Sequence, residues 1–205
     1  MEQTKKMTYM QAIRLALDEE MARDEKVVMM GQDIGILGGA YGVTGDLYKK
    51  YGPDRVIDAP LSENAIVGWG LGAAMYGWRP IMDIMKMDFS MVALDIICNH
   101  LAKYRYMSGG QIKQIPGVVR TAIGGGTRSG PHHSQSIYHL FAGFPGLKVV
   151  CASCPEDAKG LLKAAIRDND PVFFCEETAA YRLKGEVPLD PDYLVPIGKS
   201  RKVCE

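Results

Sequence analysis

Short apolar runs alternate with amphipathic stretches along most of this chain, and this alternation constrains the fold more than any other feature. Six runs have the length of buried strands, at residues 27–30, 55–57, 80–85, 117–123, 148–151 and 172–174. The stretches between them leave room for the helical crossovers that parallel strands require. The sequence therefore predicts an α/β fold, a three-layer sandwich with helices on both faces of a mostly parallel six-stranded sheet.

Capping residues mark where the predicted helices begin. Thr8 precedes a stretch with apolar residues at helical spacing, and Ser62 precedes a Gly/Ala-rich stretch. Asp88 is positioned to cap a long helix that reaches about residue 106, and a short helix is expected over 136–143. Pro155 stands at the first position of the last predicted helix.

Length and charge exclude several classes of protein. The 205 residues are 47% hydrophobic, which suits one globular domain rather than a disordered chain. The net charge is zero and no basic run occurs, so we expect neither a nucleic acid nor a membrane as partner. The N-terminus has no apolar signal segment, and this predicts a cytoplasmic location.

Two of the five cysteines form the sequence C-A-S-C, Cys151 to Cys154, at the end of a predicted strand. This is where a thioredoxin-like redox pair would lie, so a thiol-redox function is one hypothesis. The other interpretation is that both are small thiols at a strand–helix turn. An odd number of cysteines without a signal peptide favours reduced thiols.

The glycines do not form a nucleotide-binding loop. Gly68, Gly70 and Gly72 fall inside a predicted helix instead of in a strand-to-helix turn, and no G-x-x-x-x-G-K-[ST] motif occurs. Close helix packing explains them better than a dinucleotide site.

Glu63 and His133 are the candidate site residues. Glu63 follows the second predicted strand, and His132 and His133 lie in a Gly-rich loop after the fourth. Open α/β sheets bind ligands at the carboxyl ends of their strands, where both would lie. Glu63 could instead only stabilise a helix N-terminus, and the two histidines could be surface residues. No matching set of ligands completes a zinc site.

Several segments in order resemble one known family. They are LSENAIVGWGLGAAMYGWRPI, MDFSMVALDIICNHLAKYRYMSGG, HHSQS, FPGLKVV and PEDAKGLLKAAIRDNDPVFFCE. Over about residues 8–180 the chain resembles the beta subunit of the thiamine-diphosphate-dependent dehydrogenase of 2-oxo acid and acetoin dehydrogenase complexes. The resemblance implies a transketolase-like pyrimidine-binding domain over residues 1–180. It also implies that residues 181–205 are an extended linker toward a C-terminal domain that this sequence lacks.

The resemblance assigns roles to the candidate residues. Glu63 would hydrogen-bond the ring nitrogen of the cofactor's aminopyrimidine, and His133 would act on substrate intermediates and on transfer to a lipoyl group. Leu61, Met85 and Phe89 would line the pyrimidine pocket, although ordinary core positions explain them equally well. A monovalent cation, K⁺, would be held by main-chain carbonyls near Gly117, Ala165, Ile166, Asp168 and Asp170.

One family motif is absent. No G-D-G sequence for Mg²⁺ and the diphosphate occurs here. The resemblance therefore implies an alpha subunit that supplies that half of the site, a second beta chain and a lipoyl acyltransferase core. Two alternatives stay open, namely a transketolase-type enzyme acting on sugar phosphates and a non-catalytic assembly module. The sequence does not distinguish a 2-oxo acid from acetoin as substrate.

Overall fold

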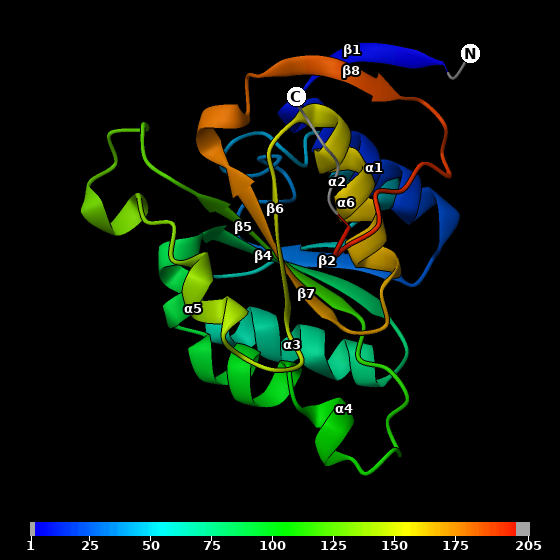
Figure 1. The fold of residues 1–205 in the computed structure, drawn as a ribbon, viewed down its shortest axis with the longest axis vertical. Coiled ribbons are helices and arrows are strands. Elements are labelled where there is room, and N and C mark those ends of the chain that lie inside the picture. The colour runs from blue at the N-terminus through cyan, green and yellow to red at the C-terminus, as the bar shows by residue number, and fades with distance from the viewer. Residues whose placement is uncertain (1–2, 200–205) are drawn as a thin grey trace.

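The computed structural model describes residues 3–199, and a six-stranded sheet forms its centre. The strands pair in the order β3-β2-β4-β5-β7-β6, and every neighbouring pair is parallel (Figure 1). The predicted sheet is therefore confirmed, with strand ends that differ from the expected ones by at most three residues. Their bounds are β2 Val27–Gly31, β3 Val56–Asp58, β4 Arg79–Lys86, β5 Gly117–Ile123, β6 Lys148–Ala152 and β7 Pro171–Glu177.

Helices cover both faces of the sheet, as expected. On one face lie α1 (Tyr9–Arg23) and α6 (Pro155–Arg167), with the short α2 (Leu47–Tyr51) near them (Figure 1). On the other lie α3 (Glu63–Met75), the π-helix η2 (Ile96–Leu101), α4 (Tyr104–Met107) and α5 (Tyr138–Ala142). The two faces bury separate clusters of apolar side chains, because successive residues of a strand point to opposite sides.

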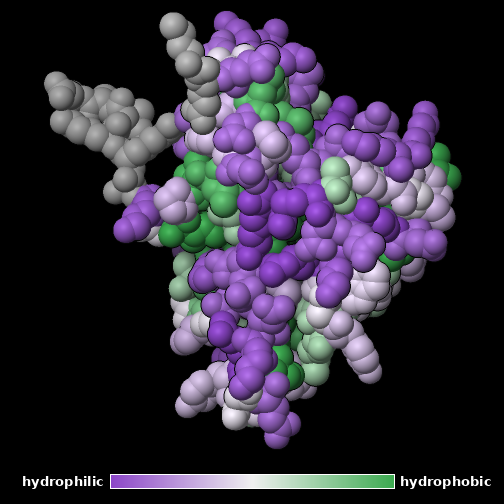
Figure 2. Space-filling model, turned by 90° about the vertical axis from the view of Figure 1, so that its right-hand side faces the viewer, coloured by the Kyte–Doolittle hydropathy of each residue, from purple (hydrophilic) through white to green (hydrophobic). Residues whose placement is uncertain are grey.

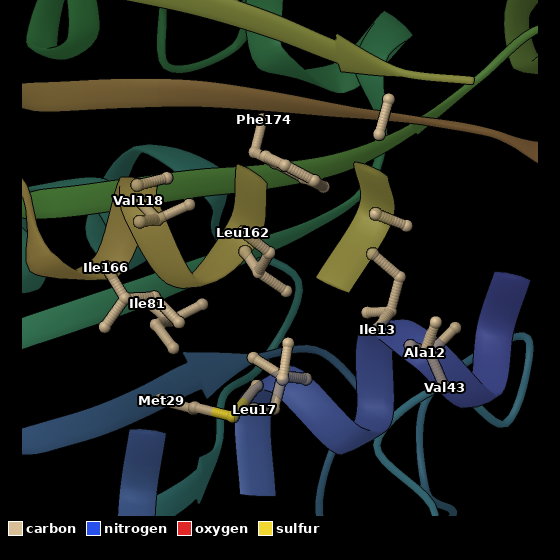
Figure 3. Close-up of a cluster of buried hydrophobic side chains, with 14 of the residues drawn as sticks. Ala12, Ile13, Leu17, Met29, Val43, Ile81, Val118, Leu162, Ile166 and Phe174 are labelled. Carbon is tan, nitrogen blue, oxygen red and sulfur yellow. The ribbon is translucent and has the colours of Figure 1, made fainter. Parts of the chain in front are cut away.

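The α1/α6 side holds the larger of these clusters. Figure 3 shows Ile13 and Leu17 of α1 and Leu162 of α6 directed toward the strand residues Val118 and Phe174, all of them fully or almost fully buried. At about 1.5–3 kcal/mol for each fully buried large aliphatic or aromatic side chain, this layer contributes strongly to folding. Thr8 begins α1 as predicted, with a capping box that it forms with Gln11.

The prediction of one long, regular helix from Asp88 to about residue 106 is wrong. The segment instead forms a 3-10 helix, η1 (Met87–Met91), followed by the π-helix η2 and the short α4. Asp88 caps no helix, because its carboxylate binds Gln135 in a distant loop. The wider π turn places Ile97, Cys98 and Leu101 on the buried side.

An antiparallel pair of strands, not expected from the sequence, lies outside the main sheet. β1 (Thr4–Thr8) pairs with β8 (Lys184–Pro188), where an unpacked connector was expected. Val187 is fully buried, and the buried Lys159 ammonium donates to the carbonyls of Pro188 (2.7 Å) and Asp190 (3.1 Å). Residues 184–190 are therefore packed against α6. The expected linker residues 200–205 lie outside the described part of the chain.

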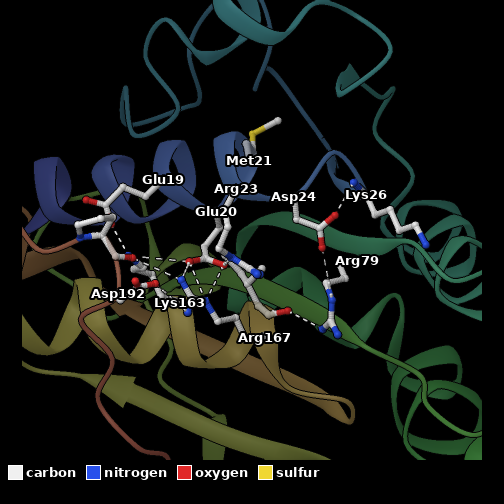
Figure 4. A network of polar contacts seen from close by, with 12 residues as sticks. Glu19, Glu20, Met21, Arg23, Asp24, Lys26, Arg79, Lys163, Arg167 and Asp192 are labelled. Atoms are coloured by element: carbon white, nitrogen blue, oxygen red, sulfur yellow. Dashed lines mark hydrogen bonds and ion pairs between the residues drawn. The ribbon is translucent and has the colours of Figure 1, made fainter.

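Charged side chains join α1 to α6 along their contact (Figure 4). The fully buried Glu20 accepts hydrogen bonds from Arg167 at 2.7–3.0 Å and from Arg23 at 2.9 Å. Lys163, which is also buried, pairs with Glu19. The buried charges of Glu20 and Lys163 thus have partners of opposite charge, as a low-dielectric interior requires.

The surface is mixed in character. Figure 2 shows the face that looks to the right in Figure 1, where hydrophilic residues predominate and apolar ones form small separate patches. Within residues 3–199, none of the helices is both long enough and apolar enough to cross a bilayer.

Candidate active site

Glu63 lies at the carboxyl edge of the sheet, as predicted. β3 ends at Asp58, and a short loop leads to Ser62 and to Glu63, the first residue of α3. The Glu63 side chain is largely buried, and the Gln32 amide donates to its Oε1 at 3.3 Å. Gln32 follows β2, the neighbour of β3. Ser62 occupies the N-cap position, but its hydroxyl makes no capping hydrogen bond.

Close packing shapes the glycine-rich loop after β2. A Cβ at Gly31 would lie 2.6 Å from the Cβ of Asp83, so only glycine fits there. The Asp58 carboxylate accepts a hydrogen bond of 2.6 Å from the Gly35 amide, which ties this loop to the end of β3. The loop that carries Gln32 is thus held against the segment that leads to Glu63.

His133 lies in a different loop over the same edge. It ends the 3-10 turn η3 (Pro131–His133), which follows β5. The edge of the Phe89 ring meets the half-buried His133 ring, with centroids 5.1 Å apart and planes at 77°. His132 is adjacent, at 4.5 Å between centroids. The Nδ1 atom of His133 is buried and has no hydrogen-bond partner among the described residues.

Of the three predicted pocket residues, two are half-buried and one is exposed. Met85 and Phe89 are half-buried, on β4 and η1. Leu61 is 82% exposed, so within this chain it forms no wall of a pocket. A half-buried apolar side chain at a site edge has surface left to contact a ligand.

A buried cluster of charges beside this site was not predicted from the sequence. Arg120 on β5 binds the carboxylates of Asp83 on β4 and Glu176 on β7, and the Tyr181 hydroxyl donates to Glu176 at 3.0 Å. Burial raises the pKa of both carboxyl groups, and the positive charge of Arg120 opposes that rise. A charged residue within or directly after each of three largely apolar runs was the available signal.

A cavity of about 20 Å³ adjoins this cluster, lined by Gln32, Asp83, Met85, Arg120 and Tyr181 among others. This volume suits one water molecule with several polar partners. The cavity connects the residue that binds Glu63 with the buried charges.

The two cysteines of the C-A-S-C sequence occupy different elements. Cys151 is exposed within β6, whereas Cys154 is the N-cap residue of α6. Cys175 on β7 is the register partner of Cys151, and its thiol lowers the pKa of Cys151. The structure shows no disulfide among the four cysteines of residues 3–199.

A family model described as "Transketolase, pyrimidine binding domain" matches residues 5–184. The chain belongs to this family. The pyrimidine-binding domain thus spans the whole six-stranded sheet and the loops with Glu63 and His133.

Relatives of this pyrimidine-binding domain carry the names of dehydrogenase beta subunits. It is 52% identical over 195 residues to "2-oxoisovalerate dehydrogenase subunit beta" of Bacillus subtilis (strain 168), covering 95% of this chain and 59% of the relative. It is 48% identical over 209 residues to "Acetoin:2,6-dichlorophenolindophenol oxidoreductase subunit beta" of Cupriavidus necator, covering 97% and 61%. It is 47% identical over 192 residues to "Pyruvate dehydrogenase E1 component subunit beta" of Gracilaria tenuistipitata var. liui, covering 94% and 59%. The chain therefore spans about three fifths of each relative's length.

Solved structures share the fold at low sequence identity. "Split gene transketolase, inactive beta4 tetramer" aligns with a TM-score of 0.65 at 19% identity, covering 83% of this chain and 51% of that one. A 2-oxoglutarate:ferredoxin oxidoreductase from Magnetococcus marinus aligns with a TM-score of 0.63 at 17% identity, covering 95% and 33%. Both support the pyrimidine-domain fold.

The site residues fit an aminopyrimidine ring. Glu63 accepts one hydrogen bond from Gln32, and a carboxylate has room to accept more. The half-buried Met85 and Phe89 are apolar, which suits the faces of a flat heterocycle.

The predicted cation ligands lie beside a positive charge. The carbonyls of Ile166 and Asp168 each accept a hydrogen bond from Arg79 at 3.0 Å, and the Asp168 carboxylate pairs with Lys148. A carbonyl oxygen has a second lone pair, so Arg79 leaves each of the two one acceptor position. Gly117 pairs in the sheet with Pro171, and Pro171 is close in sequence to Ala165 and Asp170. The cation site stays a prediction.

Proposed function

We propose that this domain supplies the pyrimidine half of the active site in the beta subunit of a thiamine-diphosphate-dependent dehydrogenase acting on a 2-oxo acid or on acetoin. One observation carries the proposal: a largely buried glutamate at the carboxyl edge of the sheet, with one donor and unused capacity to accept, in a chain whose relatives are named dehydrogenase beta subunits.

Glu63 is the residue that would hold the cofactor in its reactive form. Its carboxyl group would exchange a proton with a ring nitrogen of the aminopyrimidine, while Gln32 fixes the orientation of the carboxyl. Met85 and Phe89 would contact the ring, and the exposed Leu61 would do so where the alpha subunit covers it. When bound, thiamine diphosphate supplies a nucleophilic carbon and an electron sink for cleavage next to a carbonyl.

His133 would act on the substrate side. Its ring packs against Phe89, and its Nδ1 atom has no hydrogen-bond partner among the described residues. In this proposal His133 serves the later steps, including transfer of the acyl unit to a lipoyl carrier.

The remaining half of the site would come from an alpha subunit that binds Mg²⁺ and the diphosphate, because this sequence has no G-D-G motif. A second beta chain and a lipoyl acyltransferase core complete the proposed complex, in the cytoplasm. K⁺ is the proposed ion at the carbonyls of Gly117, Ala165, Ile166, Asp168 and Asp170.

Reconstitution with the alpha subunit tests the proposal. The complex should show thiamine-diphosphate-dependent oxidation of a 2-oxo acid or acetoin, and Glu63→Gln should lower kcat by about 10²-fold or more, the scale of lost acid–base catalysis. Glu25→Gln, at an exposed turn, is the matched control. Unchanged turnover by the Glu63 variant would overturn its role. Activity with sugar phosphates alone would favour the transketolase-type alternative, and no activity with any substrate would favour an assembly module.

A further inference from the structure

The loop that carries His133 has few long-range hydrogen bonds. Within residues 127–135, most of those that the structure shows are local, such as those of Ser134 and His133 to the carbonyl of Gly130. The backbone is left-handed at Gly126, Arg128 and Gly130, so the loop follows an irregular path without the hydrogen bonds of a regular element. Contacts from other elements must therefore fix the place of His133.

Asp88 provides such a contact. Its Oδ1 accepts hydrogen bonds from the backbone amide of Gln135 at 3.3 Å and from the Gln135 side-chain amide at 2.9 Å. The Gln135 carbonyl in turn accepts from the Gly124 amide at 3.3 Å, which closes the base of the loop. Gln135 stands two residues after His133, so Asp88 holds the backbone next to the histidine.

The same short helix also holds the histidine ring. Phe89 directly follows Asp88 in η1, and its ring edge meets the ring of His133. Asp88 is 7% exposed, and its hydrogen bonds to Gln135 are therefore formed in a poorly solvated environment, where they are stronger than at the surface. One turn of 3-10 helix thus fixes both the backbone and the ring.

We propose that Asp88 is a positioning residue for His133, which acts through Gln135 and keeps the 127–135 loop in the conformation that the reaction requires. The kinetic part of this inference rests on the proposed function. The structural part does not, since the loop conformation is measurable without turnover.

The Oδ2 atom makes a sharp test available. It is buried and has no hydrogen-bond partner among the described residues. Asp88→Asn therefore keeps an acceptor oxygen for Gln135 and places its amide where no contact is lost. Asp88→Leu keeps the branching at Cγ, puts methyl groups in place of the oxygens and removes the acceptor. Gln135→Ala removes the hydrogen bond from the Gln135 side chain to Asp88. Gln135 is exposed, so this substitution should affect folding less than one at the buried Asp88.

The experiment compares these variants in the αβ complex, with Asp54→Leu as an exposed control. In Asp88→Leu, kcat should fall about 10²-fold, as expected for a misplaced catalytic group, while the KM for the 2-oxo acid changes less than about threefold. Asp88→Asn should recover most of kcat. Combining Asp88→Leu with Gln135→Ala should cost no more than Asp88→Leu alone, because both remove one interaction.

Hydrogen exchange of residues 127–135 provides the readout that does not need the reaction. Exchange in this loop should accelerate in Asp88→Leu and Gln135→Ala and stay near the parent rate in Asp88→Asn. Unchanged exchange in both Asp88→Leu and Gln135→Ala would overturn the inference. Faster exchange in a complex that lacks dehydrogenase activity altogether would sustain the positioning and count against the proposed function alone. Equal loss of kcat in the Asn and Leu variants would show that the charge, and not the contact to Gln135, is what matters, and would also overturn it.

Discussion

The side-chain amide of Gln32 donates a hydrogen bond to the carboxylate of Glu63, at 3.3 Å between Nε2 and Oε1. This bond connects the loops that follow two adjacent parallel strands. Gln32→Ala should therefore lower kcat/KM of the reconstituted complex by about tenfold, the worth of one hydrogen bond to a charged group. Gln3→Ala, at an exposed position, is the control for a lost glutamine amide. Steady-state kinetics decide the matter, and equal kcat/KM for both variants would contradict the prediction.

Replacing Arg120 should make the free energy of unfolding depend more strongly on pH. Burial already raises the pKa of Asp83 and Glu176, and Arg120 limits that rise. In Arg120→Met the folded-state pKa of both carboxyls should rise further above the unfolded values. A carboxyl whose pKa is higher in the folded state than in the unfolded state contributes stability that is fully present below its unfolded-state pKa. That contribution is lost as the pH rises through its folded-state pKa.

The Arg120→Met variant should accordingly lose about 3–5 kcal/mol at pH 8 and clearly less at pH 5. Urea unfolding at the two pH values measures the difference. Arg105→Met, which breaks the exposed pair with Asp170, should cost at most about 1 kcal/mol at either pH. A loss at pH 5 as large as that at pH 8 would show that the carboxylates do not depend on Arg120.

Lys159 should determine whether residues 184–190 stay packed. Its buried ammonium donates to the carbonyls of Pro188 and Asp190. In Lys159→Met the apolar volume stays and these donors disappear, so trypsin should cleave after Arg182 or Lys184 several times faster. Lys148→Met, at a half-buried lysine on β6, serves as control. Identical cleavage rates would mean that the pairing of β1 with β8 holds the segment without Lys159.

Cys151 should be the cysteine of the β6–β7 pair that reacts with thiol reagents. It is exposed and its pKa is lowered, whereas Cys175 is buried and its pKa is raised. Iodoacetamide labelling followed by mass spectrometry should find Cys151 modified first. Cys151→Ser and Cys154→Ser should both keep full dehydrogenase activity. A large loss in either would revive the thiol-redox hypothesis.

The alternation of apolar runs was enough to predict the sheet, its parallel direction and the helices on both faces, since strand and helix periodicities are local properties. Glu63 and His133 were predicted as site residues because they follow strands and match family motifs, and their roles stay predictions. The pairing of β1 with β8 was not predicted, because its partners lie at opposite ends of the chain and β8 contains the polar sequence Lys184–Pro188. The contact between Asp88 and Gln135 was missed for a similar reason: Asp88 also suits a helix cap, and only the tertiary structure shows which partner it binds.

Arg120 has a consequence for how the sequence of this domain can change. The guanidinium binds carboxylates from two other strands, so replacing any one of the three residues takes a partner from at least one buried charge. The path to a neutral cluster then passes through intermediates of low stability. Among homologues of this domain, we expect Asp83, Arg120 and Glu176 to be conserved together or substituted together, so that the three positions covary.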